Sequence, residues 1–352
     1  MMKWEGIYRH YREFLPEIED EHIVSLNEGH TPLLRARNIK KFIGADLEIY
    51  FKLEGLNPTA SFKDRGMTVA VSIAKKKGVE AIICASTGNT SASAAAYAGR
   101  AELRCYVLIP EGKIALGKLS QAIIHGATVI QIKGNFDDAL KIVKEISEKY
   151  PVTVVNSINP FRLEGQKTAS FEICDWLGVS PTHHILPVGN AGNIAAYWNG
   201  YKEYKKCGKI GSLPRMVGFQ ADGAAPIVRS KIIHDPDTVA SAIRIGNPAN
   251  WQKAVSARDE SGGIIEMISD KEILSAYKAV ASMEGVFCEP ASSITIAGVK
   301  RLAAEGYFKK GDVLVCTITG HGLKDPSLAI EIAEKPQTVK PVYSEVIRVI
   351  GF

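Results

Sequence analysis

Lys63 is the residue whose type and setting point most directly to chemistry. It lies within residues 57–66, NPTASFKDRG, between the turn signal Asn57-Pro58 and the apolar, helix-forming run of residues 67–74. An amine near the positive end of a helix loses its proton more easily and can then attack a carbonyl carbon. A lysine at a helix start is more often a solvated side chain. The other motifs of the chain therefore have to decide between the two interpretations.

Two glycine-bearing turns are the next candidates for chemistry. Residues 81–96 (AIICASTGNTSASAAA) and residues 185–196 (ILPVGNAGNIAA) each read as a short strand, a Gly/Asn turn and a helix start. Glycine lets backbone N–H groups approach an anion closely, and a helix start favours negative charge. Each turn is suited to a phosphate or a carboxylate, although turns of this kind also begin helices that bind nothing.

The composition is that of an ordinary soluble globular protein. The chain has 352 residues, of which 46% are hydrophobic and 23% charged. Its formal net charge of +5 is not concentrated in any block, so we expect neither a nucleic acid nor a membrane as partner. The first residues lack the apolar stretch of a signal peptide, and no apolar run is long enough to span a bilayer. Six dispersed cysteines and eight histidines without ligand spacing predict reduced thiols, a cytoplasmic location and no metal site.

Apolar, β-branched runs alternate with helical patterns, which predicts an α/β fold with mainly parallel, twisted sheets flanked by helices. The predicted strands are residues 81–84, 104–109, 128–132, 152–155, 184–188, 216–220 and 313–318. The predicted helices are residues 64–77, 89–99, 115–125, 136–149, 161–176, 193–204, 270–283 and 290–304. We expect two domains, each with its own sheet: a small one over residues 57–156 and a large, discontinuous one over residues 1–56 and 157–352.

Taken together, three segments resemble one family. Residues 28–33 (EGHTPL), 55–66 (GLNPTASFKDRG) and 319–326 (TGHGLKDP) resemble threonine synthase, one of the pyridoxal-phosphate enzymes that share a fold with the tryptophan synthase β subunit. The resemblance extends over nearly the whole chain. It implies that pyridoxal 5'-phosphate binds in a cleft between the two domains, where open α/β sheets commonly bind ligands.

The resemblance also assigns a role to individual residues. Lys63 would form the Schiff base, Asn89 would bind the phenolic oxygen, and Thr319 would bind the pyridine nitrogen. The cup for the cofactor phosphate would consist of Gly189, Asn190, Ala191, Gly192 and Asn193. A threonine hydroxyl cannot keep the pyridine nitrogen protonated as an aspartate does, which predicts a weaker electron sink. Without the resemblance, Thr319 and Asn89 read equally well as a strand end and a helix cap.

The implied reaction converts O-phospho-L-homoserine and water to L-threonine and phosphate, as the last step of threonine biosynthesis. Lys63 would carry protons at Cα and Cβ while phosphate leaves from Cγ and water adds at Cβ. The substrate carboxylate is expected at a helix start, and the substrate phosphate at the segment after residue 155, where an arginine can bind it in bidentate fashion. The residues expected to bind the substrate are Ser86, Thr87, Thr90, Asn156, Ser157, Arg162 and Asn190.

Two other functions fit the same fold. A serine/threonine dehydratase would use the same cofactor, but such enzymes carry four consecutive glycines in the phosphate loop and lack an acidic residue at the position of Asp64. A non-catalytic protein that binds the cofactor would have no need of Lys63. Family members are commonly dimers, so a homodimer is expected.

Overall fold

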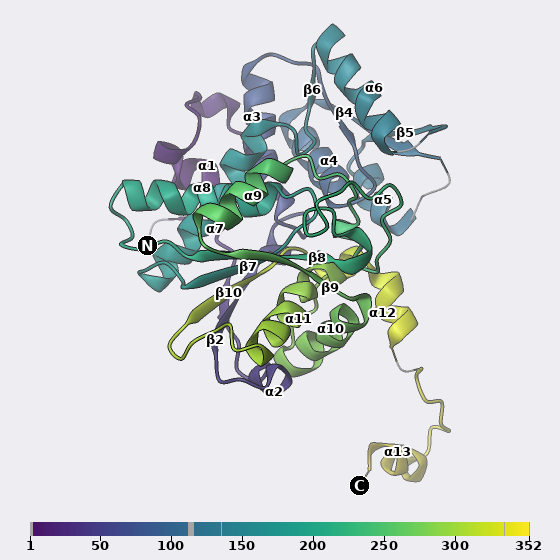
Figure 1. Ribbon diagram of the computed structural model, residues 1–352. Helices are drawn as coiled ribbons and strands as arrows, with labels where there is room; N and C mark the ends of the chain where they lie inside the picture. The colour runs from purple at the N-terminus through teal and green to yellow at the C-terminus, as the bar shows by residue number, and fades with distance from the viewer. Residues whose placement is uncertain (1–2, 112–115, 135, 334, 352) are drawn as a thin grey trace.

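The computed structural model describes residues 3–111, 116–134, 136–333 and 335–351, and the chain folds around two sheets (Figure 1). The strands are β1 (Leu33–Arg35), β2 (Glu48–Leu53), β3 (Ala81–Ala85), β4 (Arg104–Pro110), β5 (Thr128–Ile132), β6 (Val152–Val154), β7 (His183–Pro187), β8 (Arg215–Ala221), β9 (Ile264–Ile268) and β10 (Val313–Ile318). The α-helices are α1 (Ile7–His10), α2 (Lys40–Ile43), α3 (Lys63–Lys76), α4 (Asn89–Ala101), α5 (Leu116–Ile124), α6 (Phe136–Lys149), α7 (Pro160–Leu177), α8 (Gly192–Lys206), α9 (Trp251–Glu260), α10 (Asp270–Glu284), α11 (Pro290–Ala304), α12 (Pro326–Ile332) and α13 (Tyr343–Ile350). Short 3-10 turns include η3 (Glu54–Leu56) and η6 (Gly322–Lys324).

The smaller sheet has four parallel strands in the order β5-β4-β3-β6. Alternate side chains of β3 point to opposite faces of this sheet, as strand geometry requires. Ile82 and Cys84 pack with α3 and α4, whereas Ile83 and Ala85 pack with α6. Both faces are therefore covered by helices, which is why β3 reads in the sequence as a continuous apolar run.

The larger sheet has six strands in the order β1-β2-β10-β7-β8-β9, and only β1 runs antiparallel to its neighbour. Helices α7, α8 and α9 lie on one face, and α2, α10 and α11 lie on the other (Figure 1). The predicted α/β fold with parallel sheets is confirmed. All four strands of the smaller sheet fall within residues 57–156, and the division into two domains at those residues stays our proposal.

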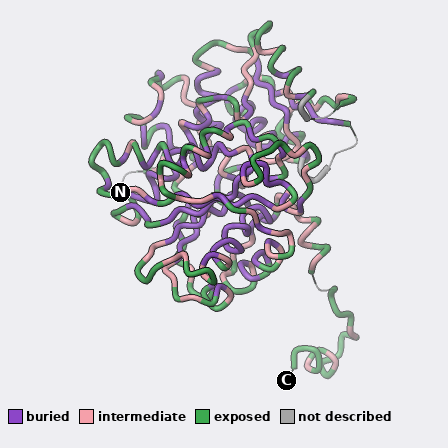
Figure 2. The backbone as a smooth tube through the Cα atoms, viewed as in Figure 1, coloured by how far each residue is buried: buried purple, intermediate pink, exposed green. Residues whose placement is uncertain are grey.

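Several elements were not predicted from the sequence, among them β1, β2, β9, α9 and α13. Strand β2 was missed because Lys52 interrupts its apolar run, yet this lysine is buried beside Glu172, with Nζ 2.6 Å from Oε2. The predicted helix 115–125 corresponds to α5, and residue 115 lies outside the described residues. The C-terminal α13 stands away from the rest of the chain and has no buried residue (Figures 1 and 2).

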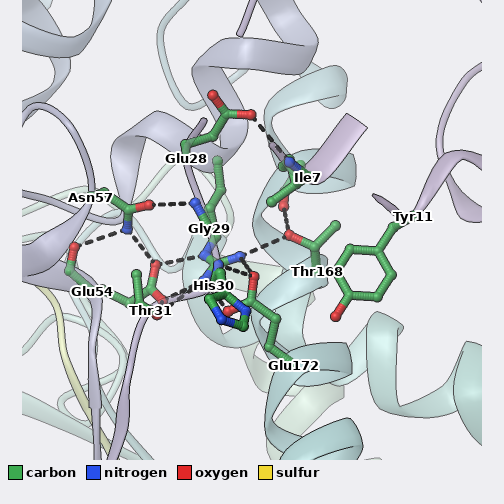
Figure 3. A network of polar contacts seen from close by, with 12 residues as sticks. Ile7, Tyr11, Glu28, Gly29, His30, Thr31, Glu54, Asn57, Thr168 and Glu172 are labelled. Atoms are coloured by element: carbon green, nitrogen blue, oxygen red, sulfur yellow. Dashed lines mark hydrogen bonds and ion pairs between the residues drawn. The ribbon is translucent and has the colours of Figure 1, made fainter. Parts of the chain in front are cut away.

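Helix α3 is fastened to the larger sheet and to α7 by a buried cluster of charges (Figure 3). Both carboxylate oxygens of Glu54 and of Glu172 accept hydrogen bonds from the Arg65 guanidinium, at 2.6–2.8 Å. Lys52 supplies a second positive charge to Glu172. Burial alone would raise the pKa of Glu172, but Arg65 and Lys52 outweigh it and hold that pKa well below its usual range. This four-charge cluster of Lys52, Glu54, Arg65 and Glu172 is formally neutral, which lets it lie in the interior.

Candidate active site

Lys63 is the first residue of α3 and is half-buried, with Nζ 4.3 Å from the centroid of the Phe62 ring. Burial, helped by the positive charge of Arg162, lowers the pKa of Lys63 to about 7, and the negative charge of Glu289 opposes this effect. A large part of the amine is therefore neutral near pH 7, which is the form that attacks a carbonyl carbon.

The turn after β3 leads into α4, whose first residue is Asn89. Ser86, Thr87, Asn89 and Thr90 are all half-buried, and no side chain caps the helix start. By contrast, α7 is capped by its preceding asparagine and α10 by a serine. The first N–H groups of α4 are thus not used by a capping side chain and can be offered to an anion.

The turn after β7 leads into α8 in the same way. Ala191 adopts a left-handed conformation, with φ 62°, and α8 begins at Gly192 without a capping side chain. The carbonyl of Asn190 accepts a hydrogen bond from Asn250 N at 3.1 Å, and the Asn250 side chain reaches Ser157 O at 3.2 Å. Asn250 therefore joins the predicted phosphate cup to the predicted substrate segment.

Thr319 and Asn89 come from distant parts of the chain and meet at one carboxylate. Thr319 Oγ1 is 2.8 Å from Glu289 Oε1, and Asn89 Nδ2 is 2.9 Å from Glu289 Oε2. The backbone carbonyl of Thr319 also accepts from Phe62 N at 3.0 Å, directly before Lys63. The three residues predicted to bind the cofactor ring are thus held in one connected region.

The predicted substrate segment lies at the end of the smaller sheet. Asn156 Oδ1 accepts from Ala85 N at 2.9 Å and Nδ2 donates to Ala85 O at 2.8 Å, so this side chain fixes the turn that carries Ser86 and Thr87. Arg162 is fully buried on α7 and donates from Nη1 to Val155 O at 3.1 Å. Its Nε and Nη2 atoms have no hydrogen-bond partner among the described residues.

Glu289 and Asn250 are the site residues that the sequence did not reveal. Glu289 precedes Pro290, and an acidic residue before a proline is an ordinary helix start, which is how the segment reads. No local signal marks it, because only the fold brings Glu289 to the carboxyl end of β10, where its N–H donates to Gly320 O at 2.9 Å. Asn250 lies between the 3-10 turn Ser241–Ile243 and α9, and neither element was predicted from the sequence.

The described ranges contain no group of three or more histidine, cysteine or acidic side chains that could hold a metal. Within the same ranges, no helix is long and apolar enough to cross a membrane.

Comparison with known proteins first identifies the class of enzyme to which the chain belongs. The family model "Pyridoxal-phosphate dependent enzyme" matches residues 24–320. Among solved structures, maize serine racemase superposes with a TM-score of 0.74 at 19% identity, covering 93% of this chain and 97% of that one. The processed threonine deaminase isoform 2 of Solanum lycopersicum superposes with a TM-score of 0.74 at 20% identity, covering 94% of this chain and 95% of that one. At these identities the superpositions show the fold alone.

Curated relatives narrow the class. A threonine synthase of Halalkalibacterium halodurans is 56% identical over 341 residues, which is 97% of this chain and 96% of that one. Threonine synthases of Synechocystis sp. and Methanocaldococcus jannaschii are 54% and 55% identical and cover 99% and 94% of this chain, and 92% and 84% of their own lengths. The chain therefore belongs to the threonine synthase family of pyridoxal-phosphate-dependent lyases.

The residues of the site fit this cofactor. An amine with a lowered pKa is present for its aldehyde, and two uncapped helix starts are present for anionic groups. Thr319 and Asn89 add a hydroxyl and an amide, held together by Glu289. These are the kinds of groups that a protein must provide to pyridoxal phosphate.

Proposed function

We propose that this protein converts O-phospho-L-homoserine and water to L-threonine and phosphate, with Lys63 as the catalytic residue. The observation that supports this substrate is the state of Arg162. Its guanidinium is buried, and its Nε and Nη2 atoms have no hydrogen-bond partner among the described residues. Burial of unpaired donors on a charged group costs free energy unless an anion accepts hydrogen bonds from them. A phosphate on the substrate is such an anion.

The bound cofactor supplies an electron sink that stabilises negative charge at carbons next to the substrate amine. Lys63 would bind the cofactor covalently, and once freed from it would hold and move protons at Cα and Cβ. Its pKa of about 7 suits both tasks, because the amine can take up a proton and give it back near neutral pH. The cofactor phosphate would lie on Gly189, Asn190, Ala191, Gly192 and Asn193, at the start of α8.

The two anionic ends of the substrate would occupy different loops. Ser86, Thr87 and Thr90 would bind the carboxylate at the uncapped start of α4. Asn156, Ser157, Arg162 and Asn190 would bind the phosphate. Asn156 already uses one amide hydrogen on Ala85, and an amide nitrogen carries two, so one remains for the substrate.

We also propose that the protein is a cytoplasmic homodimer. The thiols support a reducing compartment, since the six cysteines form no disulfide and only Cys207 is exposed among them. Dimers are expected from the family resemblance, and light scattering at several concentrations would test this.

The experiment that tests the function compares two products on the same preparation. Phosphate released from O-phospho-L-homoserine and keto acid formed from L-threonine are measured in parallel, with L-threonine identified by chromatography. We expect stoichiometric phosphate and L-threonine, with little keto acid. Rapid keto acid formation without phosphate release would point to a dehydratase, and no product with bound cofactor would point to a non-catalytic protein.

Arg162→Met tests the phosphate site within that assay. It keeps much of the side-chain volume but removes the charge, so kcat/KM for O-phospho-L-homoserine should fall by about 10- to 100-fold, the worth of one charged hydrogen bond. Cofactor affinity should change far less. Arg104→Met, which removes an exposed arginine paired with Glu80, is the control and should leave both values unchanged. Equal losses of cofactor and substrate binding in Arg162→Met would instead assign the arginine a structural role.

A further inference from the structure

Glu289 lies between the two residues proposed to bind the cofactor ring, and its own role is not yet assigned. It is 4% exposed and accepts from Thr319 at 2.8 Å and from Asn89 at 2.9 Å. A Cβ at residue 320 would lie 2.6 Å from the carboxylate carbon, so Gly320 gives the carboxylate its place against the backbone. Glu289 N also donates to Gly320 O at 2.9 Å, which fixes the start of α11 to the end of β10.

The contacts of Thr319 determine which way its hydroxyl proton points. An ionised carboxylate can only accept hydrogen bonds, and a hydroxyl has one proton, so the proton of Thr319 lies on the bond to Glu289. Ser292 Oγ is 2.9 Å from the same threonine oxygen and must then be the donor in that pair. Ser292 Oγ accepts in turn from Gly320 N at 3.3 Å.

The remaining capacity of the threonine oxygen follows by counting. Thr319 Oγ1 donates its one hydrogen bond to Glu289 and uses one lone pair to accept a hydrogen bond from Ser292, which leaves one lone pair. The oxygen can therefore accept a further hydrogen bond but cannot donate one. Two hydroxyls and one carboxylate are enough to set this direction.

We infer that Glu289 turns Thr319 into an obligate acceptor, so that the ring nitrogen of bound pyridoxal phosphate is held in its protonated form. The inference rests on the proposed function, in which Thr319 faces that nitrogen. It differs from the expectation raised by the sequence, that a hydroxyl partner leaves the nitrogen neutral. The carboxylate would act through the threonine, as a positioning residue, by fixing the direction of the hydroxyl proton.

Three titratable groups lie near the Glu289 carboxylate. Two of them are the amines of Lys63 on α3 and Lys324 in η6, and the negative charge of Glu289 opposes the lowering of the pKa of each amine. In the loaded protein Lys63 would be joined to the cofactor, so Lys324 is the amine that stays free beside the carboxylate. The thiol of Cys288 is the other titratable group affected, and burial, followed by the charge of Glu289, raises its pKa to about 12, so it stays neutral.

The direct test is ¹⁵N NMR of the protein loaded with pyridoxal phosphate labelled at the ring nitrogen. Protonated and neutral pyridine nitrogens resonate in well-separated regions. We expect the wild-type signal in the protonated region near pH 8. In Glu289→Gln the amide can donate to Thr319 while its oxygen accepts from Asn89, which frees the threonine proton for the ring nitrogen. The signal should then move to the neutral region.

Two further variants separate this effect from general damage. Ser292→Ala removes a neighbour of Thr319 but leaves its proton on Glu289, so the signal should stay protonated. Glu266→Gln removes one negative charge from an exposed position on β9 and should change nothing.

A neutral nitrogen in the wild-type protein overturns the inference, even if Glu289→Gln fails to take up cofactor. An unmoved, protonated signal in a loaded Glu289→Gln also overturns it. Neither result touches the proposed function, which stands or falls on phosphate release by the wild-type protein.

Discussion

At the scale of single residues, the reactivity of Lys63 is set by opposing neighbours. Burial and Arg162 favour the neutral amine, whereas Glu289 favours the charged one, and the balance is a pKa of about 7. Arg162 thus has two effects in the proposed function: it binds an anion and it helps to deprotonate the nucleophile. Once a substrate phosphate neutralises the guanidinium, Lys63 should become a stronger base.

This balance predicts how cofactor uptake depends on pH. Only the neutral amine attacks the aldehyde, and below pH 7 its share falls about tenfold per unit. The rate of uptake by cofactor-free protein, followed by absorbance, should therefore rise up to about pH 8 and then level off. An uptake rate that still rises above pH 9 would contradict the lowered pKa.

The variant Lys63→Ala should keep its fold, as measured by circular dichroism. It should take up no cofactor that borohydride can fix covalently to the protein.

At the scale of elements, the position of Lys63 depends on how closely α3 approaches α7. Gly66 on α3 and Gly165 on α7 face each other, and a Cβ at residue 165 would lie 1.8 Å from Arg65 O. A side chain there would have to displace the backbone that carries Lys63 and Arg65. The contact therefore controls both the site and the charged cluster.

Gly165→Ala should accordingly destabilise the protein by about 1–3 kcal/mol or more, as overpacking does, and should lower activity beyond the loss of folded protein. Gly99→Ala is the matched control, because Gly99 is exposed inside α4 and the nearest atom that a Cβ there would meet beyond its own helix backbone is His125 O, at 3.7 Å. That change should stabilise by about 0.5–1 kcal/mol. Urea unfolding of both variants measures the difference, and equal effects would show that α3 and α7 can separate at little cost.

The same elements show what the sequence could predict. Strands covered on both faces are continuous apolar runs, so the central strands β3, β4, β7, β8 and β10 were found. Strand β2 was not found, because Lys52 can be buried in it only through its ion pair with Glu172, which is far away in sequence. Glu289 was missed for a similar reason: locally it begins a helix, and only the fold brings Asn89 and Thr319 to it.

At the scale of the whole molecule, the C-terminal segment is the part least attached to the rest. Helix α13 buries none of its residues, and Tyr343 is 80% exposed. Contacts with the rest of the chain lie earlier: Ser241 Oγ donates to Asp325 Oδ2 at 2.8 Å, and Ala329 and Ile332 of α12 pack against the core. Surface segments with no buried contacts contribute little to stability.

Removal of the residues after 333 should therefore change the free energy of unfolding by no more than about 0.5 kcal/mol and leave the rate of phosphate release intact. Limited proteolysis should cut first within residues 335–342, which precede α13. A large loss of stability, or a change of oligomeric state in light scattering, would show that α13 makes contacts beyond those within one chain.

The four-charge cluster determines whether residues 57–156 and the rest of the chain can be produced as separate fragments. Arg65 comes from within residues 57–156, whereas Lys52, Glu54 and Glu172 come from outside them. A fragment without residues 57–156 would retain two interior carboxylates and a single ammonium, an excess of negative charge that an apolar setting does not tolerate. Excision at these boundaries should yield an insoluble larger piece, and co-expression of both pieces should rescue it.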